Sequence, residues 1–263
     1  MTARQWKEET ARVGGADFVC IEGGSGKPLL VLHDEIGHPG WLKWHAALAA
    51  NRTLSIPLHP GFGRSARIDW IRSVRDLACF YARFLREQKM APVDVIGFSF
   101  GGWVAAEMAV NDAKQFRRMV LVAPAGIRPP EGEILDQFPI TGREYFEKTV
   151  LDPKRTPEFE TLYGGAHTPE QYEAFEDARA ESARLAWQPY FHNPSLVPLL
   201  EGIEPPPTLI VWGKEDRVIP PSAAKAYQQA IRGSEVCLLE RCGHRPEIEQ
   251  SAAFIERVTR FLG

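Results

Sequence analysis

The chain has 263 residues, of which 44% are hydrophobic and 25% charged, and its formal net charge is −3. This length is enough for one large domain, or for one domain that carries an insertion. A weak negative charge without blocks of lysine or arginine gives no reason to expect a nucleic acid or an anionic membrane as a partner.

The start of the chain, MTARQWKEETARVGG, contains no apolar run, so we expect neither a signal peptide nor a membrane anchor. The four cysteines form no CxxC pair and lack the spacing to histidine of a metal site; they are Cys20, Cys79, Cys237 and Cys242. We expect reduced thiols in a cytoplasmic protein. Since the sequence has no P-loop, dinucleotide or EF-hand motif, we expect no cofactor and no metal.

Short apolar segments bounded by glycine or proline predict the strands of a sheet. They occur at 28–33, 53–58, 93–98, 117–123, 207–213 and 234–240. Near-continuous apolar runs are typical of strands that are buried on both faces, as in a parallel sheet. Segments with helical spacing lie between or after them, at 73–88, 103–110, 221–231 and 250–262. The alternation predicts an α/β fold, a mostly parallel sheet flanked by helices.

This alternation is interrupted once, between about residues 127 and 200. The sequence there is aromatic, charged and helix-like, as in REYFEKTVL and PEQYEAFEDARAESARLAW. We interpret 127–200 as a mainly helical cap, inserted into a core made of 1–126 and 201–263. Four cap aromatics are candidates for the wall of a substrate pocket, with packing inside the cap as the alternative: Phe138, Tyr145, Trp187 and Tyr190.

The segment GFSFG at 97–101 matches the G-x-S-x-G motif. In that motif a serine stands on a very tight turn from a strand to a helix, and the flanking glycines avoid a collision. Ser99 follows a predicted strand and precedes a predicted helix, and Gly102 adds a third small residue, so a chance match is the weaker explanation. We therefore predict that Ser99 is a nucleophile and that the backbone N–H of Phe100 holds a developing oxyanion.

A nucleophilic serine needs a base, and the base needs an acid that orients it. Asp216, in GKEDRVIP, and His244, in RCGHRPEIE, each follow a predicted strand. Both thus lie at the carboxyl ends of strands, where open α/β sheets bind ligands. We predict His244 as the base and Asp216 as the acid, with the neighbouring Glu215 as an alternative acid.

Together these motifs make the sequence resemble the α/β-hydrolase superfamily over almost its whole length. The resemblance rests on LHDEIGHPGW, HPGFGRS, GFSFGG, GKEDRVIP and CGHRPEIE. The chain looks most similar to cap-bearing serine esterases and to hydrolases of meta-cleavage products, which cut a carbon–carbon bond with the same triad. The resemblance implies an α/β-hydrolase fold, the triad Ser99, His244 and Asp216, and an oxyanion hole made by the N–H groups of Glu35 and Phe100. Only the backbone of Glu35 is expected to matter for that role.

The chain departs from the family pattern at His33-Asp34, where the family usually has His-Gly. Glycine allows backbone angles that aspartate adopts less readily, so the change bears on the oxyanion hole. It also brings two carboxylates, those of Asp34 and Glu35, near the mouth of the site. We expect solvated loop charges, with a role in orienting water or a substrate hydroxyl as the alternative; Asp34 is thus also a candidate pocket residue.

The resemblance implies a serine hydrolase that cleaves small-molecule carboxylic esters through an acyl-enzyme. The enzymatic alternative is carbon–carbon hydrolysis of a vinylogous diketo acid, which needs cations for the substrate carboxylate. Candidates for those cations are Arg64, Arg143 and Arg184. A third hypothesis is a binding protein on the same fold, whose triad recognises a ligand without turning it over.

Overall fold

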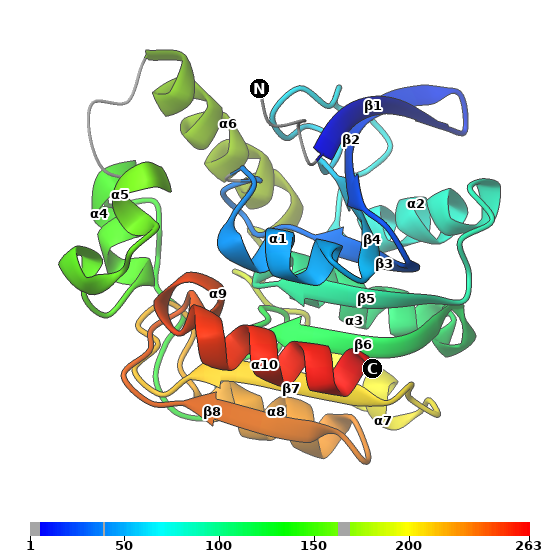
Figure 1. The fold of residues 1–263 in the computed structure, drawn as a ribbon. Coiled ribbons are helices and arrows are strands. Elements are labelled where there is room, and N and C mark those ends of the chain that lie inside the picture. The colour runs from blue at the N-terminus through cyan, green and yellow to red at the C-terminus, as the bar shows by residue number, and fades with distance from the viewer. Residues whose placement is uncertain (1–5, 39, 163–168) are drawn as a thin grey trace.

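The computed structural model describes residues 6–38, 40–162 and 169–263, which form a sheet covered by helices on both faces (Figure 1). Within this part of the chain the sheet has eight strands in the order β1-β2-β4-β3-β5-β6-β7-β8. The strands are β1 (Trp6–Val13), β2 (Ala16–Gly24), β3 (Lys27–Leu32), β4 (Arg52–Pro57), β5 (Val93–Phe98), β6 (Phe116–Val122), β7 (Thr208–Gly213) and β8 (Glu235–Leu239). Strand β2 is antiparallel to β1 and β4, and all other neighbours are parallel. The predicted mostly parallel sheet is confirmed.

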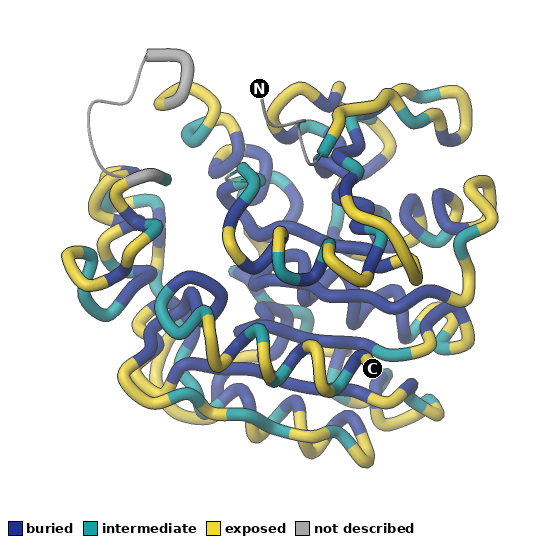
Figure 2. The backbone as a smooth tube through the Cα atoms, in the orientation of Figure 1, coloured by how far each residue is buried: buried dark blue, intermediate teal, exposed yellow. Residues whose placement is uncertain are grey.

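Burial separates the strands in the middle of the sheet from the strand at its edge. All six residues of β5 and of β7 are buried, and Figure 2 shows the middle of the sheet in dark blue. Strand β1 instead reads WKEETARV, and only one of its residues is buried. Strand β1 has no apolar run, in keeping with its place at the solvent-exposed edge of the sheet, and it was not among the predicted strands. Strand β2 was not predicted either, although it contains the apolar run FVCI at 18–21.

Helices cover the two faces of the sheet. In Figure 1, α1 (Lys43–Ala49) and α10 (Ser251–Leu262) cross one face, and α2 (Val74–Glu87), α3 (Phe100–Asn111) and α8 (Ser222–Ala230) cover the other. Ten consecutive residues of α3, from Phe100 to Ala109, are buried. The helix that follows Ser99 is thus packed on all sides, which fixes its first turn in the core.

Between β6 and β7 the chain leaves the sheet and forms α4 (Gly142–Thr149), α5 (Phe159–Leu162), α6 (Pro169–Ala186) and α7 (Leu196–Glu201). Figure 1 shows α4 and α5 beside the ends of the strands, to the left, with α6 above them. This segment has the mainly helical character of the predicted cap, whose bounds of 127 and 200 stay a prediction. None of the helices in the described ranges is both long enough and apolar enough to cross a membrane.

Candidate active site

Ser99 lies at the turn between β5 and α3 in a rarely populated backbone conformation, with φ 45° and ψ −111°. Such a conformation costs about 1–3 kcal/mol and persists only where the surroundings hold it. Here the backbone N–H of Ser99 donates to the carbonyl of Val122 on β6, at 2.9 Å, and its carbonyl accepts from Ala125 at 3.0 Å. The neighbouring strand therefore fastens the turn that carries the serine.

The glycines of the motif are required because the turn brings backbone segments into contact. A Cβ atom on Gly97 would lie 2.5 Å from the carbonyl oxygen of Gly101. A Cβ atom on Gly101 would lie 2.3 Å from the carbonyl oxygen of Leu32, at the end of β3. The structure thus has the tight turn that the G-x-S-x-G motif predicts.

His244 and Asp216 meet at the same edge of the sheet. Nδ1 of His244 lies 2.8 Å from Oδ2 of Asp216, and both side chains are buried. The other oxygen of Asp216 accepts hydrogen bonds from the N–H groups of Val218 and Ile219, at 2.8 and 3.0 Å. With Asp216 fixed by its own loop, Nδ1 of His244 is held as a donor and Nε2 is left for chemistry.

The alternative acid, Glu215, points elsewhere. Its Oε2 accepts a hydrogen bond from the backbone N–H of Cys242 at 2.9 Å. The His244 ring donates its Nδ1 hydrogen bond to Asp216 instead, so the structure contradicts Glu215 as the orienting acid.

Three buried polar atoms at this edge lack a hydrogen-bond partner among the described residues: Ser99 Oγ, His244 Nε2 and Glu35 Oε2. In this structure the serine and histidine therefore do not hydrogen-bond to each other. Such bonds often tighten only when a substrate is bound. Buried polar atoms are nearly always satisfied in folded proteins, so three of them at one edge of the sheet make this edge the candidate place for a substrate.

The Glu35 side chain lies in the site, where only a backbone role was expected. It is 1% exposed, and its Oε1 accepts a hydrogen bond from the hydroxyl of Tyr145 on α4. Burial favours the neutral carboxyl, but His244 and the hydroxyls of Tyr145 and Ser99 outweigh it and lower the pKa of Glu35. Its own backbone N–H acts in the same direction, so the carboxylate lies at the predicted oxyanion-hole donor.

The charge of Glu35 also acts on the predicted base. Burial alone opposes a charge on His244, but the carboxylates of Asp216 and Glu35 outweigh it and raise the pKa of His244 to about 9. Arg245 acts in the opposite direction, and its effect is smaller. The neighbouring carboxylates thus favour the protonated form of the imidazole.

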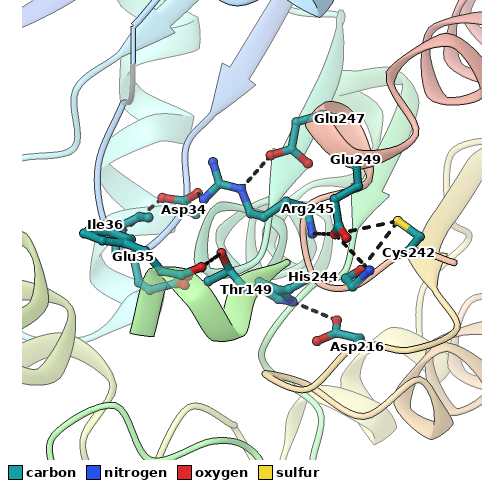
Figure 3. A network of polar contacts seen from close by, with 12 residues as sticks. Asp34, Glu35, Ile36, Thr149, Asp216, Cys242, His244, Arg245, Glu247 and Glu249 are labelled. Atoms are coloured by element: carbon teal, nitrogen blue, oxygen red, sulfur yellow. Dashed lines mark hydrogen bonds and ion pairs between the residues drawn. The ribbon is translucent and has the colours of Figure 1, made fainter. Parts of the chain in front are cut away.

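Asp34 is buried as well, so the expectation of solvated loop charges is wrong for both carboxylates. Its Oδ2 lies 2.6 Å from Nη1 of Arg245, whose Nε lies 2.7 Å from Oε1 of Glu247. Figure 3 shows the guanidinium of Arg245 between these two carboxylates. Asp34 is not among the described residues with positive φ, so this position makes no use of the freedom that glycine would give. Asp34 serves as an ion-pair partner, in a loop whose conformation aspartate adopts without strain.

A buried histidine holds this loop in place. Nε2 of His33 accepts a hydrogen bond from the backbone N–H of His59 at 2.9 Å. Burial lowers the pKa of His33 to about 3, so the ring is neutral and can accept that bond. His33 thus fixes the start of the segment that carries Asp34 and Glu35.

Of the four predicted cap aromatics, Tyr145 alone makes a hydrogen bond to a residue of this site, through Glu35. Phe138, Trp187 and Tyr190 pack against one another, with ring centroids 5.1 to 6.2 Å apart. Trp187 is 56% exposed, and the Tyr190 hydroxyl donates to the carbonyl of Leu135 at 2.9 Å. Packing within the cap therefore describes these three residues, and Tyr145 is the one that reaches Glu35.

The predicted oxyanion-hole donors, the N–H groups of Glu35 and Phe100, make no backbone hydrogen bond in the described structure. Across the described ranges, no group of three or more His, Cys, Asp or Glu residues is arranged to hold a metal ion.

Comparison with known proteins agrees with this geometry. Residues 29–257 match the sequence profile of the alpha/beta hydrolase family. The chain is 27% identical to a 2-hydroxymuconate semialdehyde hydrolase of Pseudomonas sp. (strain CF600), over 92% of this chain and 88% of that protein. It is 28% identical to the monoacylglycerol lipase abhd6-B of Xenopus laevis, over 90% and 77%. A membrane phospholipase A described as a bacterial virulence factor has a similar structure, with a TM-score of 0.79, 25% identity and coverage of 98% and 86%. The chain therefore belongs to the alpha/beta hydrolase family.

Proposed function

We propose that this protein hydrolyses uncharged carboxylic esters through an acyl-enzyme on Ser99. The strained turn of Ser99 and the bond between His244 and Asp216 support this reading. So do the relatives that are named as lipases. Relatives named as hydrolases of 2-hydroxymuconate semialdehyde and related compounds support carbon–carbon hydrolysis as the second candidate.

The proposed reaction begins with neutral His244, which takes the proton of Ser99 Oγ as that oxygen attacks the ester carbonyl. The carbonyl π electrons move to oxygen, and the N–H groups of Glu35 and Phe100 stabilise the oxyanion. The carbonyl re-forms, the C–O bond to the alcohol breaks, and His244 gives its proton to the departing alkoxide. Water, deprotonated by His244, then releases the acid in the same way. Asp216 holds the imidazole and stabilises its charged form throughout.

The proposal of an uncharged substrate rests on the buried Glu35 carboxylate beside Ser99 and His244. Two like charges about 4 Å apart repel by about 4 kcal/mol at an effective dielectric constant of about 20. A substrate that carries its own carboxylate near the reacting carbonyl would meet this repulsion, and an uncharged ester would not.

The cations proposed for a substrate carboxylate have other partners. Arg64 is ion-paired with Glu8, and Arg143 lies 3.2 Å from Glu147; both arginine side chains are mostly exposed. Arg184 binds Glu181 within α6 and the carbonyl of Ile71. Buried Arg245 is held by Asp34 and Glu247, as described above. These pairings favour ester hydrolysis over cleavage of a diketo acid.

A matched pair of substrates tests this proposal. The p-nitrophenyl esters of butyric acid and of monosuccinic acid have acyl groups of similar length, and only the second carries a carboxylate. We expect wild-type kcat/KM to favour the butyrate by about 100-fold or more, since about 1.4 kcal/mol corresponds to a factor of ten. Glu35→Gln should narrow the ratio, Glu107→Gln on α3 should leave it unchanged, and Ser99→Ala should abolish turnover. A preference for the succinate, or rapid cleavage of a vinylogous diketo acid with no ester turnover, would contradict the proposal.

A further inference from the structure

The loop after β8, residues 240–245, carries His244 and is tied on one side to the loop that carries Asp216. The backbone N–H of Cys242 donates to Oε2 of Glu215 at 2.9 Å, and the N–H of Glu215 donates to the carbonyl of Cys242 at 3.0 Å. These two bonds join the loops of the base and the acid. They leave the other side of the loop for further contacts.

On that other side the loop lies against the end of α4, in the cap segment 149–151. The backbone N–H of His244 donates to the carbonyl of Thr149 at 2.8 Å. The approach is close, because a Cβ atom on Gly243 would lie 3.0 Å from the backbone nitrogen of Leu151 and 3.1 Å from the carbonyl oxygen of Thr149. The absence of a side chain at Gly243 therefore lets the two backbones come into direct contact.

The carboxylate of Glu249, at the end of the short helix α9 (Pro246–Glu249), binds both of these segments. Its Oε2 accepts the backbone N–H of Leu151 at 2.7 Å, and its Oε1 accepts those of Gly243 at 2.8 Å and Arg245 at 3.3 Å. Figure 3 shows this carboxylate beside the loop that carries the base. Hydrogen bonds to an ionised acceptor are among the stronger ones in proteins. One oxygen thus binds the cap, and the other binds the residues on both sides of the base.

We propose that Glu249 is a positioning residue that clamps the His244 loop to the cap segment 149–151 and so holds the imidazole in place for both steps of the reaction. The kinetic consequence rests on the proposed function, while the clamp itself does not depend on the reaction. Glu249 acts through the backbone of Gly243 and Arg245, which flank the base. Cap and base are mechanically joined in this way, so a displacement of the end of α4 also moves the imidazole.

Two variants disturb the clamp by different means. Glu249→Gln keeps the size of the side chain but has only one oxygen, so it cannot accept N–H groups on both sides. Gly243→Ala keeps the carboxylate, and its new Cβ presses on the cap segment 149–151. Glu107→Gln is the matched control, because this buried carboxylate on α3 also binds the insertion between β6 and β7, at Asn193 and 2.6 Å, and not the loop of the base.

Hydrogen–deuterium exchange of the full-length protein, measured by mass spectrometry on its peptides, reports on the clamp directly. It is run at about pH 8.5, above the pKa of Glu249, which burial raises to about 7. We expect exchange in the peptides that contain 149–151 and 242–245 to be faster by about tenfold or more in both clamp variants. Glu107→Gln should leave it unchanged there. Unchanged exchange in both clamp variants would overturn the proposal.

The position of the imidazole is followed by NMR at the same pH. The proton that Nδ1 of His244 donates to Asp216 is expected at low field, as the signal that His244→Gln removes. Glu249→Gln should shift or broaden this signal, and Glu107→Gln should not. Faster exchange with an unmoved signal would show that the clamp holds only the backbone, which would overturn the positioning role.

Ester hydrolysis by the same variants tests the kinetic consequence. Since His244 serves both acylation and deacylation, Glu249→Gln should lower kcat by about tenfold or more and keep KM within about twofold. Full kcat in Glu249→Gln would overturn the proposal. Faster exchange and a moved imidazole signal in Glu249→Gln, with no ester hydrolysed by the wild type, would retain the clamp and contradict the proposed function.

Discussion

Gly101 shows at the scale of a single residue how the nucleophile turn depends on close backbone contact. A Cβ atom there would lie 2.3 Å from the carbonyl oxygen of Leu32 and 2.4 Å from that of His33. Since both atoms belong to the backbone, Gly101→Ala must displace the end of β3 or the turn itself. We expect the free energy of unfolding to fall by about 1–3 kcal/mol and ester turnover to be lost.

Urea denaturation measures this effect, with Gly202→Ala as the control. Gly202 has φ −83°, and the nearest atom to its Cβ would be the carbonyl oxygen of Leu199 at 3.4 Å. The control should lose no stability. Equal stability of the two variants would show that the glycine of the motif is not required by packing.

The sequence predicts some residues of the site well because strand ends position them. Ser99, Asp216 and His244 each follow an apolar strand, and the carboxyl ends of parallel strands share one edge. The roles of the Asp34 and Glu35 side chains were not predictable in this way. The direction in which these two side chains point depends on partners that are distant in sequence, Arg245 and Tyr145. The one sequence signal of their importance was the presence of two carboxylates beside the expected oxyanion hole.

At the scale of secondary-structure elements, α4 is tied to the core by a buried hydrogen bond to a charged group. Tyr145 is 1% exposed and donates to the Glu35 carboxylate. Hydrogen bonds of this kind contribute about 1.5–3 kcal/mol. We expect Tyr145→Phe to lower the free energy of unfolding by that amount, measured by urea denaturation.

The exposed Tyr172 on α6 provides the comparison for this variant. It is 49% exposed, so Tyr172→Phe should change stability by no more than about 0.5 kcal/mol. If Tyr145→Phe were as mild as Tyr172→Phe, the contact between α4 and Glu35 would not hold this helix to the core.

The sequence predicted the elements that have either a continuous apolar run or a clear helical spacing of apolar residues. The expected strand at 93–98 is β5, and the expected helix at 250–262 is α10 with a start one residue later. Strand β1 was not predicted because a strand at a solvent-exposed edge needs no continuous apolar run. Strand β2 was missed although it contains the apolar run FVCI. In the cap, the sequence does not distinguish aromatic residues that pack inside the cap from those that contact the site, since both environments bury the same kind of side chain.

At the scale of the whole molecule, the sheet brings together loops that are more than two hundred residues apart in the chain, such as those of Asp34 and Arg245. The insertion between β6 and β7 adds Tyr145 to the same edge. We infer that core and cap together form the site: the core supplies nucleophile, base and acid, and the cap fixes the charge beside them. The family profile, which spans residues 29–257, covers both parts.

The most direct test of the central claim is detection of the acyl-enzyme. The protein is mixed with p-nitrophenyl acetate at alkaline pH and quenched in acid after short times, and its intact mass and digested peptides are measured by mass spectrometry. We expect a transient gain of one acetyl group on the peptide that contains Ser99, and none in Ser99→Ala. Ester turnover with no acetyl group on Ser99, or turnover that persists in Ser99→Ala, would contradict the account.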